Sequence, residues 1–390
     1  MNTTTTGLRI CMLTARFYPH LGGTEQQAWY LSEKLIENGY TAFIVTQRYP
    51  GTLPKTESIG KVKVIRLSTL WDGYKGSFIF VWTTFWWLLM HANEYDIIHA
   101  HLASSHAVVA LKIGWLLRKP VVIKFAGARA TGDIGTSKKV PWGGLKLSFL
   151  RIFGNRFVCP SMEVKDEMVL NGFNSDNIAV IPNGVDTKKF APADEGQKKK
   201  LRVTLGLPAE DKLFIYTGRL QPGKGLEFMV KTWKNVLIKD STAKLLIVGD
   251  GVLIDELKNL ADECGITNNV IFTGRVNDVP DYLRAADVFV TASKGEGMSN
   301  ALLEALSCGI PAVVTDIPAN TVLVKNRVNG LVYSIDDTEM FVNIVNRLMS
   351  EAGLSQKLGT AAHESVLAKY SVDTVTQQYI QYYKKLVNKQ

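Results

Sequence analysis

Short apolar runs alternate with longer amphipathic segments along almost the whole chain. In the first half, six runs have the length and composition typical of strands: "LRICMLT", "TAFIVTQ", "YDIIHA", "PVVIKFAG", "NRFVCPS" and "NIAVIPNG". Five more follow in the second half: "KLFIYTG", "KLLIVGDG", "NVIFTGR", "ADVFVTAS" and "IPAVVTD". Because strands that alternate with helical patterns are typical of βαβ units, this pattern predicts parallel sheets with crossover helices.

A polar segment near the middle of the chain, "NGVDTKKFAPADEGQKKKL", interrupts this alternation and has no hydrophobic period. The length of 390 residues is also about twice that of a usual domain. We therefore predict an α/β fold of two Rossmann-like, doubly wound domains over 1–185 and 201–370, joined by a linker over 186–200. A terminal amphipathic helix is predicted over 371–390. Ligands of such sheets bind outside the carboxyl ends of the strands, which predicts a ligand in a cleft between two facing domains.

The formal net charge of +9 is concentrated in the first half of the chain. Residues 1–185 contain 20 lysines and arginines against 12 aspartates and glutamates, whereas the remainder contains 25 against 24. A basic half indicates an anionic partner, such as phosphate headgroups, a pyrophosphate-linked substrate or nucleic acid, unless it is only a solvated face. The sequence has no zinc-finger spacing, RNA-binding aromatic signature or densely basic helix, so we do not expect nucleic acid as a partner.

The cysteines and the first residues indicate the compartment. The four cysteines are scattered without paired spacing, which predicts neither a zinc site nor a disulfide framework. The N-terminal stretch "MNTTTTGLRICML" is polar before its first apolar run, unlike a secretory signal peptide. Both observations favour a reducing cytoplasm.

Two carboxylates, Glu296 and Glu304, stand eight residues apart in the stretch that follows "ADVFVTAS". Ser299 or Asn300 is expected to cap the helix "ALLEALSCG", which places Glu304 one turn into that helix on a face of small residues. Ionised carboxylates accept strong hydrogen bonds from ribose or sugar hydroxyls, so the pair is a candidate ligand site near a helix N-terminus. The alternative is tight helix–sheet packing, with Glu296 as a solvated loop residue.

Three further stretches at predicted strand ends are candidate binding loops. In "YTGRLQPGKGL", Arg219 and Lys224 precede a helix N-terminus, which favours a diphosphate site. The spacing is not that of a Walker loop. The alternative is an ordinary surface loop that happens to contain the same residues. Gly22 and Gly23 allow the backbone to approach a phosphate or sugar, without the spacing of a dinucleotide fingerprint. In "DIIHAHLASS", His99 and His101 stand at a strand end, where a histidine is either a ligand contact or a packing residue.

These motifs and their order resemble retaining glycosyltransferase family 4. The resemblance rests on "GGTE", "VIPNGVD", "GRLQPGKG", "IVGDG", "FTGRV" and "EGMSNALLEALSCGIPAVVTD", and it extends over nearly the whole chain. It implies the two-domain GT-B fold, and a terminal helix after "KYSVD" that returns to the first domain.

The resemblance also implies a role for each matching residue. Arg219 and Lys224 would hold the donor diphosphate, Glu296 the transferred sugar and Glu304 the ribose, with His101 beside the donor sugar. The expected donor-binding set is completed by Gly22, Gly23, Gly218, Arg275, Val276, Gly297, Met298, Ser299 and Asn300, of which Arg275 and Val276 would edge the nucleobase.

One departure from the family concerns the acceptor side. Many members have a histidine in a turn after the fourth strand, where this chain has "KFAG" followed by "ARATGD". Lys124 and Asp133 stand in that region, so we expect them on the acceptor side of the site.

The function implied is transfer of a hexosyl unit, with retention, from a UDP- or GDP-linked sugar to a hydroxyl group of a saccharide or lipid-linked saccharide. This would be a step of cell-surface polysaccharide or glycolipid biosynthesis. The sequence has no Asp-x-Asp motif, so neither a metal ion nor another cofactor is expected. The alternatives are a nucleotide-sugar epimerase of the same architecture and a non-catalytic regulator that binds nucleotide sugars.

Two segments of the first half suggest contact with a membrane. Residues 76–95 are apolar nearly all round and contain three tryptophans and three phenylalanines, whereas residues 137–156 are basic, aromatic and amphipathic. Segments of this kind lie on anionic lipid surfaces, which predicts a cytoplasmic protein that is peripheral on the inner face of the membrane. The alternative is that both are crossover helices packed on the sheet or at a partner interface.

Overall fold

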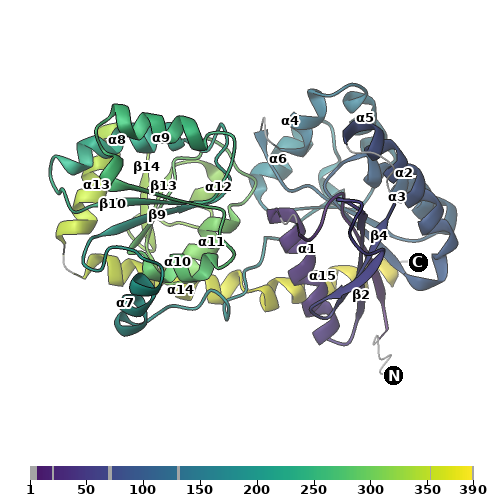
Figure 1. The fold of residues 1–390 in the computed structure, drawn as a ribbon. Helices are drawn as coiled ribbons and strands as arrows, with labels where there is room; N and C mark the ends of the chain where they lie inside the picture. Colours follow the sequence, from purple (N-terminus) through teal and green to yellow (C-terminus); the bar gives the residue numbers. More distant parts are fainter. Residues whose placement is uncertain (1–6, 20–21, 69–72, 130–131, 352, 389–390) are drawn as a thin grey trace. The chain divides into compact units, whose positions relative to one another are not determined.

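The structure is a computed structural model, shown in Figure 1, and it describes the whole chain except residues 1–6, 20–21, 69–72, 130–131, 352 and 389–390. The chain forms two compact units. The first consists of Met1–Gly184 together with Val372–Gln390, and the second of Val185–Ser371.

The first unit is built on an eight-stranded sheet in the described residues. Its strands are β1 Arg9–Leu13, β2 Thr41–Gln47, β3 Thr56–Ile59, β4 Val62–Leu67, β5 Ile97–His101, β6 Val121–Lys124, β7 Phe157–Cys159 and β8 Ile178–Val180. Its helices are α1 Gly23–Glu37, α2 Gly73–Met90, α3 Ser105–Leu117, α4 Asp133–Lys138, α5 Gly143–Phe153, α6 Met162–Leu170 and α15 Val372–Val387, with short 3-10 turns at Ala92–Glu94 and Ser175–Asn177.

The strand order in this sheet is β3-β4-β2-β1-β5-β6-β7-β8, and every pair is parallel except β3 with β4. Alternate side chains of the central strands point to opposite faces, as the pleat requires. Cys11 and Leu13 pack into the core under α2, α3 and α5, whereas Ile10 and Met12 pack under α1 and α15. The sheet is therefore buried on both faces, which explains why its strands are continuous apolar runs.

The second unit is built on a six-stranded sheet in the described residues. Its strands are β9 Leu213–Thr217, β10 Lys244–Val248, β11 Val270–Gly274, β12 Val288–Val290, β13 Ala312–Thr315 and β14 Gly330–Tyr333. Its helices are α7 Glu195–Thr204, α8 Leu226–Leu237, α9 Ile254–Glu263, α10 Val279–Ala285, α11 Asn300–Ser307, α12 Pro318–Thr321, α13 Thr338–Ser350 and α14 Leu354–Lys369, with a 3-10 turn at Thr267–Asn269.

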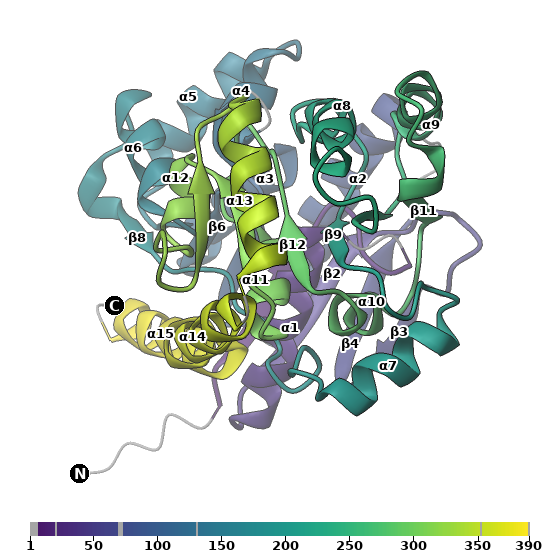
Figure 2. The same cartoon turned by 90° about the vertical axis from the view of Figure 1, so that its left-hand side faces the viewer.

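All neighbouring strands of this sheet are parallel, in the order β11-β10-β9-β12-β13-β14. Figures 1 and 2 show α8 and α9 over one face of the sheet and α10 and α14 over the other. Trp233 on α8 packs fully buried against Phe214 of β9, with ring centroids 5.3 Å apart. Helices on both faces of a parallel sheet confirm the predicted doubly wound architecture.

All eleven strands predicted from apolar runs are present, but β3, β4 and β14 were not predicted. Residues 186–200, which were predicted to be a linker, belong to the second unit, and α7 begins inside them at Glu195. Asp194 caps this helix by accepting a hydrogen bond from the backbone N–H of Gln197 at 2.8 Å. The lysine-rich stretch that was interpreted as a linker is therefore a capped helix.

The terminal helix α15 belongs to the first unit, although it follows the second unit in the sequence. It packs against α1, where Lys34 forms an ion pair with Asp373 at 3.0 Å. Farther along, the hydroxyl of Tyr383 lies 2.6 Å from Nδ1 of His99 on β5. The helix thus closes the face of the sheet that α1 covers (Figure 1).

The first unit exposes many large apolar side chains on three neighbouring helices, because α3 contacts both α2 and α5. We call this the apolar surface; it consists of Phe78, Trp82, Trp86 and Met90 on α2, Trp115 and Leu116 on α3, and Leu145, Ile152 and Phe153 on α5. No helix in the described part of the chain is long and apolar enough to cross a membrane.

Candidate functional site

The order of the strands reverses once in the sheet of the second unit, between β9 and β12. β9 is followed in sequence by β10 on one side, whereas β12 is followed by β13 on the other. At such a point the following helices depart to opposite faces, and the carboxyl ends of the two strands border a crevice where ligands bind. The loop after β9 contains Arg219 and Lys224, and the loop after β12 contains Glu296.

The structure brings Lys224 and Glu296 together across this point. The Nζ of Lys224 lies 2.5 Å from Oε1 of Glu296, and both side chains are about one-fifth exposed, at 22% and 17%. Ser293 donates from its hydroxyl to the same carboxylate oxygen at 3.0 Å. The pair is therefore fixed in position and still accessible to a ligand.

Two backbone contacts hold these loops against one another. Gly225, the residue before α8, has a left-handed backbone with φ +67°, and a Cβ atom there would collide with the carbonyl oxygen of Ala292. The N–H of Lys294 donates to the carbonyl of Gly223 at 3.0 Å. Glycine is thus required for the close approach that places Lys224 beside Glu296.

The remaining cations of the predicted donor site lie on exposed loops. Arg219 is exposed and forms no ion pair with any residue that the structure describes, while its carbonyl accepts from the hydroxyl of Tyr216 at 3.2 Å. Gly218 has φ +146° and leads the chain out of β9. Arg275 is exposed and Val276 half-buried, directly after β11.

The helix α11 begins as the sequence predicted. Ser299 is its N-cap and accepts from the N–H of Leu302 at 3.3 Å. Glu304 lies one turn into the helix and is half-buried, with Leu302, Leu303 and Leu306 buried on the sheet side. Gly297 and Met298 are buried in the turn before this helix, and Asn300 is its first residue.

The sheet of the first unit reverses its strand order between β1 and β5. The loop after β1 leads to Gly22, the N-cap of α1, whose N–H donates to Oε2 of Glu25 at 3.0 Å. Gly23 is the first residue of the same helix. The strand β5 ends at His101, so the two predicted elements of this unit also lie at its switch point.

His101 is fully buried, and neither ring nitrogen has a hydrogen-bond partner among the described residues. Its ring stacks on that of His99 with centroids 4.3 Å apart. Burial holds the pKa of His101 well below the usual range and lowers that of His99 to about 3, with the charge of Lys124 as a further cause. Both rings are therefore neutral at physiological pH.

The two residues expected on the acceptor side are both buried. Nζ of Lys124 donates to Oδ1 of Asn183 at 2.9 Å, and burial lowers its pKa to about 8. Asp133 accepts from the backbone N–H groups of Ala103 at 2.8 Å, Ala126 at 2.7 Å and Gly127 at 3.1 Å. Both oxygens of Asp133 thus bind backbone N–H groups of neighbouring loops, and its place on the acceptor side stays a prediction.

Within the described parts of the chain, no three His, Cys, Asp or Glu side chains gather in a way that could hold a metal ion.

Two family models match the chain. The description "Glycosyltransferase Family 4" applies to residues 21–189, and "Glycosyl transferases group 1" applies to residues 197–365. The UDP-Gal:alpha-D-GlcNAc-diphosphoundecaprenol alpha-1,3-galactosyltransferase of Escherichia coli is 34% identical over 277 residues, which cover 68% of this chain and 70% of that protein. The chain belongs to glycosyltransferase family 4.

Two further proteins match a larger share of this family 4 glycosyltransferase. The alpha-monoglucosyldiacylglycerol synthase of Streptococcus pneumoniae is 26% identical over 371 residues, or 90% of this chain and 82% of that protein. The crystal structure of Anabaena Alr3699/HepE with UDP-glucose matches with a TM-score of 0.79 and 20% identity over 96% of this chain and 99% of that one. The structural match confirms the GT-B fold.

The sequence did not single out every polar residue at the switch points of this glycosyltransferase. Ser293 was predicted only as the last residue of a strand, yet it is buried and hydrogen-bonded to Glu296. Gln27 was also missed: its side chain donates to the carbonyl of Gly184 and accepts from its N–H, both at 2.8 Å. The position of Ser293 at the carboxyl end of a parallel strand was an available signal, whereas nothing local marked Gln27.

Proposed function

We propose that this glycosyltransferase moves a hexosyl unit from a UDP-sugar to a hydroxyl group of a lipid-linked or glycolipid acceptor, with retention of the anomeric configuration. The observation that carries the proposal is the accessible Lys224–Glu296 pair at the switch point of the second unit. A cation for the diphosphate and a carboxylate for sugar hydroxyls are adjacent there, which is what a nucleotide sugar requires.

The UDP part of the proposal comes from the relatives. The name of the E. coli relative specifies UDP-Gal, and the Anabaena protein was crystallised with UDP-glucose. In this chain, we assign the ribose to Glu304 and the nucleobase edge to Arg275 and Val276, as the family resemblance implies. The diphosphate is assigned to Arg219 and Lys224, together with Gly297, Met298 and Ser299 before α11 and Asn300 at its start.

The difficult step is departure of the nucleoside diphosphate, on which negative charge accumulates as the glycosidic bond breaks. Fixed cations and helix N-termini stabilise such charge without reorganisation, and losing one donor of this kind typically costs about 10²–10³ in turnover. We assign this task to Arg219, Lys224 and the N-terminal ends of α8 and α11, so that no metal ion is needed. Retention follows if the acceptor hydroxyl attacks from the side of the leaving diphosphate, whose oxygen takes the proton.

We infer from the first unit that the neutral ring of His101 lies beside the donor sugar, and that the N-terminal end of α1 at Gly22 and Gly23 contributes to donor binding. Their place at the switch point of that unit supports this assignment. Lys124 is proposed to act on the acceptor side by holding Asn183, because its ammonium group is buried and already hydrogen-bonded.

The acceptor is proposed to be membrane-linked, with the enzyme peripheral on the cytoplasmic face. The E. coli relative acts on a diphosphoundecaprenol-linked sugar and the Streptococcus relative is a diacylglycerol glycolipid synthase, according to their names. The apolar surface of the first unit supports this proposal, because Trp82 is 58% and Trp86 44% exposed on α2. An exposed aromatic surface in the more basic half of the chain is suited to an anionic bilayer.

The donor assignment is tested by thermal shift with UDP, GDP and ADP on the wild type and on Glu304→Ala. A ligand that binds only the folded state raises the melting temperature by mass action, so UDP should stabilise the wild type more than GDP or ADP. The Glu304→Ala variant should fold and show a smaller UDP shift. A folded wild type that responds to none of the three nucleotides would overturn the proposed function.

The finer statements need separate measurements. Retention is tested by the anomeric configuration of the product in NMR spectra, and metal independence by turnover in the presence of a chelator. Membrane association is tested by co-sedimentation with phosphatidylglycerol vesicles, which should decrease in a Trp82→Ser/Trp86→Ser variant and at high salt. Equal sedimentation of the wild type and this variant at low salt would contradict the membrane assignment.

A further inference from the structure

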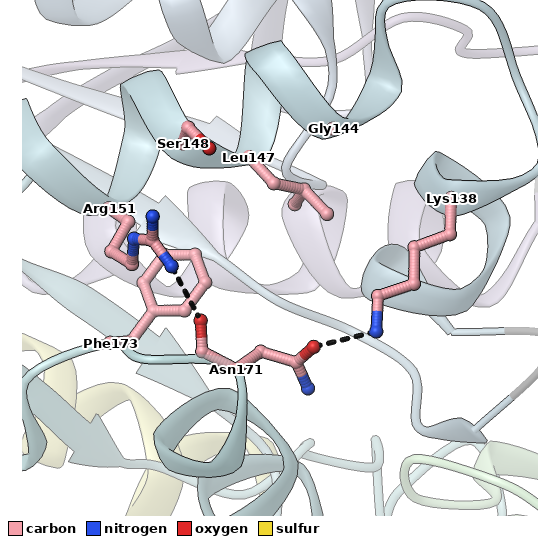
Figure 3. Close-up of a pocket in the computed structure, with 7 residues that line it drawn as sticks. All are labelled: Lys138, Gly144, Leu147, Ser148, Arg151, Asn171 and Phe173. Atoms are coloured by element: carbon pink, nitrogen blue, oxygen red, sulfur yellow. Dashed lines mark hydrogen bonds between the residues drawn. The ribbon is translucent and has the colours of Figure 1, made fainter.

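The first unit contains a cavity of about 160 Å³ that none of the proposed catalytic residues lines. It lies between α4, α5 and the loop after α6, and its lining residues are Lys138, Gly144, Leu147, Ser148, Arg151, Asn171 and Phe173 (Figure 3). A single water needs about 10–15 Å³ of such volume, so the cavity can accommodate a larger polar group.

The charges of this cavity have one sign. Its lining includes the cations Lys138 and Arg151 and the hydroxyl of Ser148, but no carboxylate. Nζ of Lys138 donates to the side-chain oxygen of Asn171 at 2.8 Å, and a guanidinium nitrogen of Arg151 lies 3.4 Å from the carbonyl oxygen of Asn171. Figure 3 shows both cations directed at this asparagine from opposite sides. Asn171 thus holds two positive charges at one cavity.

Each cation has donors left after this bond. The ammonium of Lys138 has three N–H groups and the guanidinium of Arg151 has five, so most of them are not used by Asn171. The loop is also shaped for the arginine. Gly172 has a left-handed backbone with φ +84°, and a Cβ atom there would lie 3.0 Å from Nη1 of Arg151. A cavity with two cations, a hydroxyl and no acid is suited to an anion, and phosphate is bound well by arginine and lysine.

Strongly exposed apolar side chains lie on the same elements as the lining of the cavity, which a site for a soluble anion would not require. Three lining residues have a strongly exposed apolar neighbour in the sequence. Leu145, which follows Gly144, is 64% exposed; Ile152, which follows Arg151, is 67% exposed; and Leu170, which precedes Asn171, is 86% exposed. Leu145 and Ile152 also belong to the apolar surface defined above. A molecule with its phosphate in the cavity could therefore extend its apolar part over exposed apolar side chains of the same elements.

We propose that this cavity binds the phosphate group of a membrane lipid, at a site separate from the donor site. Lys138 and Arg151 would hold the phosphate oxygens, and the exposed side chains of α5 and Leu170 would contact the adjoining hydrocarbon. This inference rests on the proposed membrane association and adds to it a defined site for one lipid molecule.

The experiment uses a short-chain lipid, dihexanoyl phosphatidylglycerol, as dispersed monomers, so that no charged surface attracts the protein. Its binding is compared with that of glycerol 3-phosphate by calorimetric titration of the full chain. The test variant is Lys138→Gln/Arg151→Gln, and the charge-matched control is Lys55→Gln/Lys63→Gln, two exposed lysines near β3 and β4 in the same unit. Melting temperatures of all three proteins establish that they fold.

We expect the lipid to bind saturably to the wild type and to the control, and glycerol 3-phosphate to bind more weakly. In the test variant, the affinity for the lipid should fall by about tenfold or more for each of the two cations removed. No saturable binding to the wild type, or an equal loss in both variants, would overturn the proposal. Binding of glycerol 3-phosphate as tight as that of the lipid would assign the cavity to a free phosphate and reject the lipid. The UDP shift measured on the same samples reports the donor site, so failure of the proposed function would be seen separately.

Discussion

Replacing Lys224 by alanine should reduce turnover far more than it reduces stability. The Lys224–Glu296 pair is about one-fifth exposed, which places its contribution to folding between those of surface and buried pairs, at about 1–2 kcal/mol. For a unit of this size, each kcal/mol corresponds to a melting temperature about 2–4 °C lower. Turnover, by contrast, should decrease by about 10²–10³, because a preorganised cation is lost and Glu296 remains to repel the diphosphate.

The control variant is Lys244→Ala, which removes a comparable ion pair from the same unit. Lys244 lies 3.7 Å from Asp211, with exposed fractions of 18% and 30%, and it is the first residue of β10, at the amino end of the sheet. The two variants should therefore lose similar stability. Hexosyl transfer from the UDP-sugar should remain close to the wild type in Lys244→Ala and be nearly lost in Lys224→Ala.

A double-mutant cycle separates a direct role of Lys224 from a role through its partner. If Lys224 acts on the diphosphate, Lys224→Ala should still reduce turnover by a similar factor in a Glu296→Gln background. If it only orients Glu296, the double variant should be no slower than Glu296→Gln alone. The assignment of this lysine to the leaving group is refuted by near-normal turnover of Lys224→Ala, or by a double variant that matches Glu296→Gln.

Three other predictions concern the folded framework. Asp133→Ala should lower the free energy of unfolding by at least about 3 kcal/mol, because three buried backbone N–H groups lose their acceptor at a cost of about 1–3 kcal/mol each. Denaturant titration measures this change. An unchanged unfolding midpoint would contradict the role of Asp133 as acceptor for the three N–H groups. The free energy of unfolding should decrease as the pH falls below about 6.5, where histidines of the unfolded chain become protonated. In the folded protein, burial lowers the pKa of His99 to about 3 and that of His106 to about 4, so these histidines stay neutral there. The variant His106→Asn should show a shallower decrease than the wild type. Gly225→Ala should reduce the thermal shift caused by UDP, because the added Cβ would displace the loop that positions Lys224. The control is Gly206→Ala. Gly206 also has a positive φ, but a Cβ there would meet no other atom, so this variant should leave the UDP shift unchanged.

The sequence predicted the central strands well because strands buried on both faces are continuous apolar runs. It failed at strands with other patterns. β4, "VKVIRL", has two basic residues among its apolar ones, and β3, "TESI", is a short polar edge strand. The helix α7 was missed for a similar reason, since its surface is mostly charged and only Arg202 is buried in it. Burial on one side of a polar segment is determined by tertiary packing, which a single sequence does not display.

The sequence predicted which residues belong to the candidate site, but it did not predict which of them contact one another. Lys224 and Glu296 are 72 residues apart, and their pairing follows from the order of β9 and β12 in the sheet. The partners of Asp133, the first residue of the short helix α4, were not predictable either, because the three backbone N–H groups that donate to it belong to residues 103, 126 and 127. Residue types at strand ends were thus predictable, whereas their partners required the topology.

The two ends of the sheet in the second unit use charged residues differently. At the amino ends of β9 and β12, Asp287 accepts from Arg202 at 2.8 Å, from Lys198 at 2.5 Å and from the N–H of Leu213 at 2.7 Å. These partners hold its pKa below the usual range despite burial, and they commit both of its oxygens to the fold.

At the carboxyl ends of the same two strands, Lys224 is bound within the described residues by one carboxylate only. Its ammonium group has three N–H donors, so it is held in position and can still bind an anion. At the amino ends of β9 and β12, both carboxylate oxygens of Asp287 are thus bound by the protein, whereas at the carboxyl ends Lys224 keeps N–H donors that a ligand can use. A purely structural pair has no need of open donors, so this difference supports Lys224 as the residue that meets the diphosphate.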